Sequence, residues 1–405
     1  MDQKRNSIES DDIDYSHLEC QRIKKIPVPG QKKYFCSYNE ENFSCGCEPK
    51  HVSLQYEPSL NILFIGKLGD KEVNQIIFLM IQTFLAEDNL QFQFYASEDI
   101  INALKKIIKN NKVQQCIKEK QTANVQLDKL IIFDQQKHEQ LISLLVTIGG
   151  DGTILYGLRF FQNRIPPPLM GFEKGTLGFM AMNEIDNLTE DINYVTQSLH
   201  NGKLLQAENK MRLHGVVKSK NNGETQKCSH FHEYHALNEI VLERGGYSSV
   251  LKIDIFVNGI FLTTFWGDGL IISTPTGSTA YNLSAGGPIM QNEVRGIVIT
   301  PICPFSLSFR PLVLPECSKL SLILSSDARG HGQVNCDGQS VYQFQACDEL
   351  LIQNSLFSVN QIRSNENFFE DWASKLKRLL NWNNTNFNKE KPSKMHQSQN
   401  QIKNQ

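Results

Sequence analysis

The sequence lacks the long apolar run that a membrane span requires. Its longest apolar stretches fall far short of the roughly 20 residues that cross a bilayer as a helix, so we expect no membrane partner. It also lacks a basic tract, because 41 Lys and Arg against 43 Asp and Glu give a formal net charge of −2 and a pI near 6.6. Nucleic-acid binding needs a positive footprint, and we therefore expect no nucleic-acid partner.

A secretory signal and a disulfide framework are absent as well. The first twenty residues carry six carboxylates and no apolar segment, which is unlike a secretory signal or a mitochondrial presequence. The ten cysteines are scattered over 405 residues without regular spacing, which is typical of reduced thiols in a large chain. The sequence therefore predicts a cytoplasmic protein.

The two best-known nucleotide-binding loops are also missing. G-x-x-x-x-G-K-[ST] does not occur, and the glycines near residue 175 have the wrong spacing for G-x-G-x-x-G. What is present is Gly-Gly-Asp-Gly-Thr at 149–153, between the apolar run 141–148 and apolar residues at helical spacing. A strand, a glycine loop and a helix in this order suit a phosphate, because the free amides at the helix start face the anion. The alternative is a plain turn, since Asp and Gly are the commonest turn formers.

The first half of the chain alternates between two hydrophobic periods. Helical patterns, such as 73–84 and 103–117, separate short apolar runs. These runs lie at 60–66, 91–95, 130–133, 141–148 and 169–172. Such alternation is typical of an α/β domain with a Rossmann-like parallel sheet. Ligands of these sheets bind beyond the carboxyl ends of the strands, where residues 149–153 fall.

From about residue 205 the pattern changes to short alternating strands, which predicts an all-β, sandwich-like domain. Residues 251–257 and 260–265 flank Asn258-Gly259, the strongest short-range hairpin signal, and Asp337-Gly338 predicts another turn. An amphipathic helix near the C-terminus is expected to pack back on the first domain. The predicted divisions are a disordered leader at 1–58, the α/β domain at 59–204, the β-rich domain at 205–362, the helix at 363–382 and a disordered tail at 383–405.

Three further stretches are candidates for ligand contact. Asn238-Glu239 interrupts an apolar strand, where a buried carboxylate and amide are costly unless they bind something; a strand end in water is the alternative. Residues 267–288 are rich in small and hydroxyl side chains, which suits close hydrogen bonding to ribose hydroxyls and a purine edge, and Tyr281 offers a stacking face. The glycine loop 175–179 fits a packing turn at least as well as a ligand contact.

Together these motifs resemble those of the NAD kinase family. Gly-Gly-Asp-Gly-Thr is followed in order by Leu-Asn-Glu-Ile-Val at 237–241, the 267–288 block, the proline-rich stretch 301–311 and Cys-Asp-Gly-Gln at 336–339. The resemblance covers roughly residues 60–360. It implies transfer of the γ-phosphoryl group of ATP to the 2′-hydroxyl of the adenosine ribose of NAD, which gives NADP. It also implies a divalent cation, Mg²⁺, and a homo-oligomer, a dimer or a tetramer.

The resemblance assigns roles residue by residue. Asp151 is similar to the catalytic carboxylate that engages the 2′-hydroxyl. The implied phosphate-binding residues are Gly149, Gly150, Gly152 and Thr153. The implied NAD-binding residues are Asn238, Glu239, Asp268, Thr279, Ala280, Tyr281, Asn282, Ser284 and Gln339. No metal ligand is fixed by a motif, so Mg²⁺ is expected to arrive with ATP, near Asp151.

The sequence also departs from the family pattern at some residues, and two other classes of protein are alternatives. No lysine or arginine is placed by motif at the triphosphate, so magnesium and backbone amides are expected to carry most of its charge. Phe305 stands where many family members have histidine, and Glu173-Lys174 stands where an apolar or small pair is usual. A lipid kinase of the diacylglycerol or sphingosine type would share only the first domain and lack the 267–288 block. A catalytically silent NAD(P)-binding sensor is the other alternative, although the expected acidic residues are present.

Overall fold

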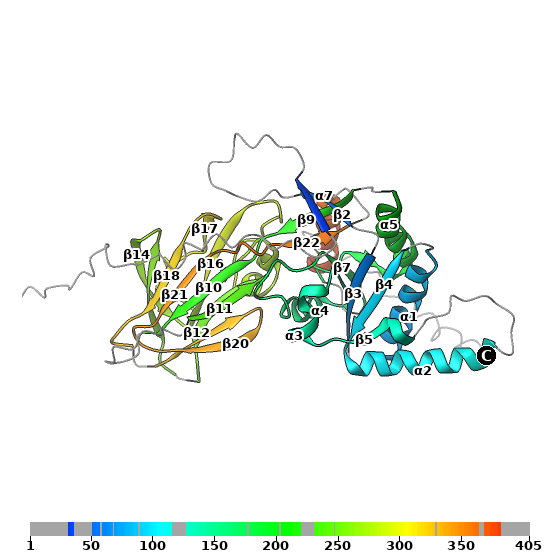
Figure 1. Ribbon diagram of the computed structural model, residues 1–405. Helices are drawn as coiled ribbons and strands as arrows, with labels where there is room; N and C mark the ends of the chain where they lie inside the picture. Colours follow the sequence, from blue (N-terminus) through cyan, green and yellow to red (C-terminus); the bar gives the residue numbers. More distant parts are fainter. Residues whose placement is uncertain are drawn as a thin grey trace, which may run out of the picture.

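Figure 1 shows a computed structural model with two halves, one built on a parallel sheet with helices and one rich in antiparallel strands. No helix in the part of the chain it describes is both long and apolar enough to cross a membrane. The described residues are 31–35, 51–56, 59–67, 69–87, 90–115, 127–175, 178–201, 204–219, 231–246, 248–328, 330–363 and 368–381.

The first half is a ten-stranded sheet in the order β1-β2-β9-β22-β7-β6-β3-β4-β5, with β8 beside β7. Strands β7, β6, β3, β4 and β5 run parallel, which confirms the predicted α/β class. All six residues of β6 are buried, as expected of a strand covered on both faces. The strands are β1 (Gln31–Phe35), β2 (His51–Tyr56), β3 (Ser59–Gly66), β4 (Gln91–Ala96), β5 (Leu130–Ile132), β6 (Leu144–Gly149), β7 (Leu169–Glu173), β8 (Asn183–Glu184), β9 (Leu205–Lys210) and β22 (Val359–Ile362).

Helices cover both faces of this sheet, because successive strand residues point to opposite sides. Phe64 and Val146 belong to the core under α1, α2 and α5, whereas Leu63 and Leu145 pack with α4 on the other side. Asp70 caps α1 by accepting hydrogen bonds from the backbone N–H groups of the first turn. The helices of this half are α1 (Lys71–Leu85), α2 (Glu98–Gln115), α3 (Gln135–His138), α4 (Asp151–Leu158) and α5 (Leu188–Asn201).

Four strands of this sheet differ from the sequence expectation. β9 and β22 come from the stretch assigned to the β-rich domain, and β1 and β2 from the stretch assigned to an irregular leader. In the structure β2 pairs with β9, β9 pairs with β22, and β22 joins β7. Hydrophobic alternation indicates which face of a strand is buried, not which strand lies beside it, so the pattern could not reveal these pairings. The predicted tail at 383–405 lies outside the described residues.

The second half consists of two six-stranded antiparallel sheets around a common core, as predicted. Asn258 and Gly259 have φ of 52° and 81°, which confirms the hairpin between β13 and β14. One sheet contains β10 (Leu213–Lys218), β11 (Phe231–Ala236), β13 (Leu251–Val257), β14 (Ile260–Gly267), β18 (Leu320–Leu324) and β21 (Glu349–Asn354). The other contains β12 (Glu239–Arg244), β15 (Gly269–Ser273), β16 (Gly296–Ile302), β17 (Leu312–Pro315), β19 (Gly332–Cys336) and β20 (Gln339–Phe344).

Buried polar contacts join the two halves. Arg212, between β9 and β10, is 1% exposed and donates to the backbone carbonyls of Phe161, Arg164 and Phe357. Burial lowers the pKa of this guanidinium to about 10, a value at which it remains charged at neutral pH. The C-terminal helix α7 (Phe368–Leu380) packs back on the first half, as predicted, with Lys375 buried against its loops.

Candidate functional site

A cavity of about 440 Å³ opens at the carboxyl ends of β3 and β6, within the size range of small-molecule sites. The glycine loop ends β6 and begins α4, so the first amides of that helix lie at the wall of this cavity. The lining residues are Ile65, Gly66, Lys67, Asp70, Val73, Ile148, Gly149, Gly150, Gly152, Thr153, Tyr156 and Lys174. The four predicted phosphate-loop residues therefore lie together in one cavity.

Two lysines of this cavity were missed by the motif-based reasoning. Lys67 follows β3 and Lys174 follows β7, and both line the cavity. Lys174 also contacts the carboxylate of Glu72 in the first turn of α1. The expectation that magnesium and backbone amides carry most of the triphosphate charge stays a prediction, to which the cavity adds two ammonium groups. A usable signal existed, because residues that directly follow parallel strands gather at the ligand-binding edge.

The side chain of Asp151 is held by the second glycine loop. Its Oδ2 accepts a hydrogen bond from the N–H of Phe179 at 2.9 Å, and its Oδ1 accepts from Met180 at 2.9 Å and Ala181 at 3.4 Å. A Cβ atom on Gly178 would lie 2.2 Å from Oδ1, so only glycine allows this approach. The packing interpretation of the second loop therefore holds at this residue.

These hydrogen bonds limit what Asp151 can do. An ionised carboxylate offers about four acceptor positions, and three backbone N–H groups occupy most of them. The half-buried side chain therefore keeps room for about one further donor. A single ligand hydroxyl fits that vacancy, and a fixed carboxylate orients it for reaction.

Asn238 and Glu239 form a second cluster, at the turn from β11 to β12. Each is 6% exposed, so the alternative of a strand end in water is wrong. Asn238 Oδ1 and Glu239 Oε2 are buried without a hydrogen-bond partner among the described residues. Burial and the nearby Asp337 carboxylate raise the pKa of Glu239 to about 8. Unpartnered buried acceptors of this kind are costly, and a ligand that donates hydrogen bonds would satisfy them.

Asp337 holds this turn in place, a role that the sequence did not indicate. Its carboxylate accepts from the N–H groups of Leu237 at 2.8 Å, Asn238 at 2.7 Å and Glu239 at 3.3 Å. Burial raises the pKa of Asp337, and these three amides oppose that rise. The predicted turn at Asp337-Gly338 is therefore also the support of the Asn-Glu pair.

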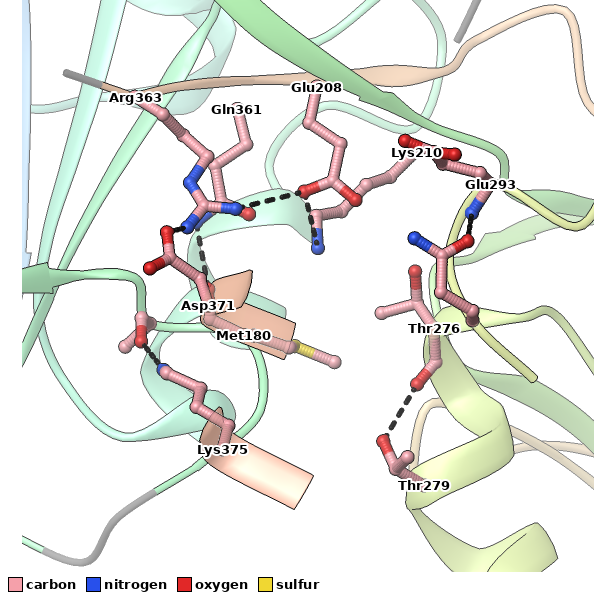
Figure 2. A network of polar contacts seen from close by, with 12 residues as sticks. Met180, Glu208, Lys210, Thr276, Thr279, Glu293, Gln361, Arg363, Asp371 and Lys375 are labelled. Carbon is pink, nitrogen blue, oxygen red and sulfur yellow. Dashed lines mark hydrogen bonds and ion pairs between the residues drawn. The ribbon is translucent and has the colours of Figure 1, made fainter. Parts of the chain in front are cut away.

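The small-residue block packs directly on this pair. Thr274 Oγ1 donates to the carbonyl of Leu237 at 2.6 Å. A Cβ on Gly277 would lie 2.1 Å from the carbonyl oxygen of Asn238, so the close approach requires glycine. Figure 2 shows Thr276 and Thr279, on this block, across from Met180 on the first half. The contacts of Thr274 and Gly277 therefore bring the block within close backbone range of the Asn-Glu pair.

The remaining predicted NAD contacts fall in different places. Ala280 and Thr279 are partly exposed, and Tyr281, Ser284 and Gln339 are exposed. Asn282 is fully buried. Its side-chain NH₂ group donates to the carbonyls of Ser278 and Pro288, and its side-chain oxygen accepts from the hydroxyl of Thr300. The side chain of Asn282 therefore stabilises the loop from inside and does not face a ligand.

Asp268 is not brought to the Asn-Glu pair. It precedes β15, whereas Glu239 is paired with Ser273 at the far end of that strand. Its Oδ1 lies 3.2 Å from Nε of Arg244. Burial, chiefly, and nearby carboxylates including those of Asp268 and Glu239 raise the pKa of Tyr281.

In the part of the chain that the structure describes, no group of three His, Cys, Asp or Glu side chains could hold a metal ion. A magnesium ion would therefore be held mainly by phosphate oxygens of its nucleotide, with Asp70 in the cavity wall as a protein carboxylate nearby.

Two family models match the chain, the ATP-NAD kinase N-terminal domain over residues 62–201 and the ATP-NAD kinase C-terminal domain over residues 237–364. An uncharacterized kinase of Schizosaccharomyces pombe is 30% identical over 335 residues, which cover 80% of each chain. The chain belongs to the ATP-NAD kinase family.

Other members of the ATP-NAD kinase family agree with this assignment. An ATP-NADH kinase of Saccharomyces cerevisiae is 35% identical over 256 residues, 61% of this chain and 50% of that protein. The match thus spans half the length of that relative. The solved structure of yeast NADH kinase complexed with NADH has a TM-score of 0.70 at 29% identity, and covers 87% of this chain and 94% of that chain.

The departures from the usual pattern of NAD kinases have definite places in the structure. Lys174 lines the cavity beside the glycine loop, and Glu173 Oε2 lies 3.7 Å from Nζ of Lys375 on α7. Phe305 is 82% exposed, and its N–H donates to the carbonyl of Trp266 on β14. Lys174 therefore lines the cavity, whereas Phe305 does not.

Proposed function

We propose that this ATP-NAD kinase transfers the γ-phosphoryl group of ATP to the 2′-hydroxyl of the adenosine ribose of NAD, giving NADP. The observation that carries the proposal is the place of Asp151. It stands in the glycine loop that lines the cavity, its carboxylate is fixed by three backbone N–H groups, and it has room for about one hydroxyl. NADH is the alternative acceptor, in view of the relatives named for it.

In this proposal the acceptor nucleotide lies against the β-rich half. Asn238 Oδ1 and Glu239 Oε2 accept hydrogen bonds from the adenosine part, which removes the cost of leaving them unpartnered. Thr276 and Thr279, on either side of the Gly277 that packs on the Asn238 carbonyl, supply further hydroxyls. The 2′-hydroxyl is then directed at Asp151, which orients it for in-line attack and receives its proton.

The donor lies in the cavity at the glycine loop. The amides at the start of α4 and the ammonium groups of Lys67 and Lys174 balance the phosphate charge. Magnesium bound with ATP supplies further charge neutralisation for the transferred group. Because phosphoryl transfer asks mostly for positioning and electrostatic stabilisation, these groups suffice for the reaction.

A homo-oligomer is part of the proposal. Apolar side chains are exposed on the edge strand β14 and beside the edge strand β17, where Trp266 is 46% exposed, Phe305 82% and Leu307 84%. Edge strands with apolar side chains are natural pairing surfaces, and a second copy of the chain would cover them. Light scattering should show a multimer that the Phe305→Ser, Leu307→Ser double variant shifts toward the monomer; an unchanged mass would reject this surface.

The cytoplasmic location predicted from the sequence remains part of the proposal. The four cysteines among the described residues, Cys303, Cys317, Cys336 and Cys347, are free thiols, which fits a reducing compartment. Imaging of the tagged chain in cells would test it, and enclosure in an organelle would reject it.

The decisive experiment is NADP formation by the purified chain with NAD, ATP and Mg²⁺, run in parallel with NADH. Product that requires magnesium and vanishes in the Asp151→Asn variant would support the kinase, and the ratio of the two rates would identify the acceptor. Dinucleotide binding without product from either acceptor would contradict the proposal and favour a silent sensor. Phosphorylation of a diacylglycerol or sphingosine substrate alone would favour a lipid kinase.

A further inference from the structure

The loop that holds Asp151 is itself held by the C-terminal segment. Figure 2 shows Gln361, on β22, and Lys375, on α7, gathered around Met180. Gln361, which is fully buried, donates from Nε2 to the carbonyl of Met180 at 2.8 Å. Lys375 donates from Nζ to the carbonyl of Gly178 at 3.1 Å and also to that of Ala181. Residues nearly two hundred positions apart thus form one unit.

These contacts fall on the same peptide groups that hold the carboxylate. The carbonyl of Gly178 and the N–H of Phe179 belong to one planar peptide unit. Lys375 binds the carbonyl end of that unit and Asp151 binds its N–H end. Likewise, Gln361 binds the carbonyl of the peptide unit whose N–H, that of Ala181, reaches Asp151. Each of these two peptide units is therefore hydrogen-bonded at both its carbonyl and its N–H group.

The ammonium group of Lys375 has an electrostatic effect on this arrangement. A cation at a carbonyl oxygen polarises the peptide and strengthens hydrogen bonding by its N–H group. Lys375 is 8% exposed, so water screens this effect little. Burial, chiefly, lowers the pKa of Lys375, whereas Glu173, first, and Asp151 oppose this change. Its charge is therefore supported by two carboxylates, one of them the proposed catalytic group.

We propose that Lys375 is a positioning residue for phosphoryl transfer, which makes helix α7 part of the active site. Lys375 fixes and polarises the Gly178–Ala181 backbone, and this backbone fixes the Asp151 carboxylate. The inference rests on the proposed function, because it assumes that Asp151 is the group that engages the acceptor hydroxyl. It adds a residue outside the family motifs recognised in the sequence.

The test compares Lys375→Met with Lys377→Met. Both lysines lie on α7, but Lys377 is exposed, so its variant removes the same charge without touching the loop. A misplaced catalytic group costs on the order of 10²-fold in rate, so we expect kcat of Lys375→Met to fall about 10- to 100-fold. The KM values for both nucleotides and the Kd for the acceptor should stay within about threefold, because neither binding surface changes.

Lys375→Arg supplies the conservative comparison. Arginine also carries several N–H donors, so we expect it to recover part of the lost kcat. Wild-type kcat in Lys375→Met would overturn the proposal. Equal loss of kcat and acceptor affinity, or a lower yield of folded protein with no change in kcat per active site, would overturn it in favour of a purely structural role.

A second measurement is independent of catalysis. Hydrogen exchange of the segment 178–181 should be faster in Lys375→Met than in Lys377→Met or in the wild type, because the Phe179 and Ala181 donors lose their fixed geometry. Unchanged exchange would overturn the coupling between Lys375 and this loop. If the wild type phosphorylated neither NAD nor NADH, the proposed function would fail, whereas faster exchange would still support the link between α7 and Asp151.

Discussion

Two aspartates, one in each half of the molecule, make the same set of hydrogen bonds. Asp151 and Asp337 each precede a glycine, and each carboxylate accepts hydrogen bonds from three consecutive backbone N–H groups of a distant segment. In the first half, the carboxylate itself is the candidate functional group, and the distant segment supports it. In the β-rich half, the carboxylate is the support, and the distant segment carries the acceptors Asn238 and Glu239.

This difference shows that three hydrogen bonds from backbone N–H groups do not by themselves make a carboxylate catalytic. The group that can bind a ligand is the one that keeps an unused hydrogen-bond acceptor position. Asp151 is half-buried and keeps about one acceptor position. The unpartnered oxygens of the other cluster belong instead to the Asn-Glu pair. If this comparison is right, substitutions at the two aspartates must fail in different ways, one in turnover and the other in acceptor binding.

The largest effect is expected for Asp151→Asn. The amide keeps the shape but puts an NH₂ group against backbone N–H donors, and it cannot take a proton from the hydroxyl. Loss of general-base catalysis costs about 10²- to 10⁴-fold, so we expect kcat to fall by about 10³-fold or more. Initial rates give this loss, and calorimetry should give a Kd for the acceptor within a few fold of the wild type. Near-normal turnover would remove Asp151 from its proposed role.

The next effect concerns the Asn-Glu pair of the β-rich half and the dependence of stability on pH. On folding, the pKa of Glu239 rises from 4.5 to about 8, so the folded state holds this proton more tightly than the unfolded chain. The resulting cost in stability is absent below about pH 4.5 and grows as the pH rises to about 8. Glu239→Gln removes the charge, so its advantage in the free energy of unfolding should reach on the order of a few kcal/mol at pH 9.

Denaturant unfolding of the ligand-free protein at pH 5, 7 and 9 measures this advantage. All other titrating groups are shared by the two proteins, so their contributions cancel in the difference. The same variant should bind the acceptor more weakly above about pH 8, where an amide replaces a carboxylate acceptor. A stability difference that does not grow with pH would show that the Glu239 carboxyl is not buried as described.

The third effect belongs to the supporting aspartate. Asp337→Asn leaves one of the held N–H groups facing an NH₂ group, and an unsatisfied buried donor costs about 1–3 kcal/mol. We expect that loss of stability, and about a tenfold rise in the Kd for the acceptor with a smaller change in kcat, because the Asn-Glu pair is displaced. Asp327→Asn, at an exposed residue paired with Lys252, is the matched control and should change both quantities little.

Much of the fold was predictable because its signals are local. The buried run before Gly149 and the Asn258-Gly259 hairpin depend on side-chain period and turn chemistry over a few residues. The placement of β9 and β22 in the first sheet was not predictable, since strand neighbours are chosen by contacts far along the chain. Local patterns therefore identified the elements but not all of their partners.

The residues of the candidate site likewise fall into those that the sequence indicates and those that only the structure reveals. Asp151 and Asn238-Glu239 stand out in sequence because a glycine loop and an apolar strand surround them. Asp337 and Lys375 do not, because they act on segments about 100 and 197 residues away. Asn282 shows the converse case, because it lies in a ligand-like block while its side chain is hydrogen-bonded internally. Motifs identify residues near a ligand, whereas the groups that support them appear only in the folded structure.

The smallest effect tests the donor side of the comparison. Lys174 stands where the family usually has an apolar or small residue, and it lines the cavity at the glycine loop. Lys174→Met should raise the KM for ATP about tenfold, the value of one charge-assisted contact of roughly 1.4 kcal/mol. The Kd for the acceptor should not change, because Lys174 follows β7 of the first sheet whereas the Asn-Glu pair stands at the start of β12 in the β-rich half. Lys106→Met, at an exposed residue of α2, is the control. Equal KM values for ATP in the two variants would mean that Lys174 contacts no phosphate. Backbone amides and magnesium would then balance the triphosphate charge without it.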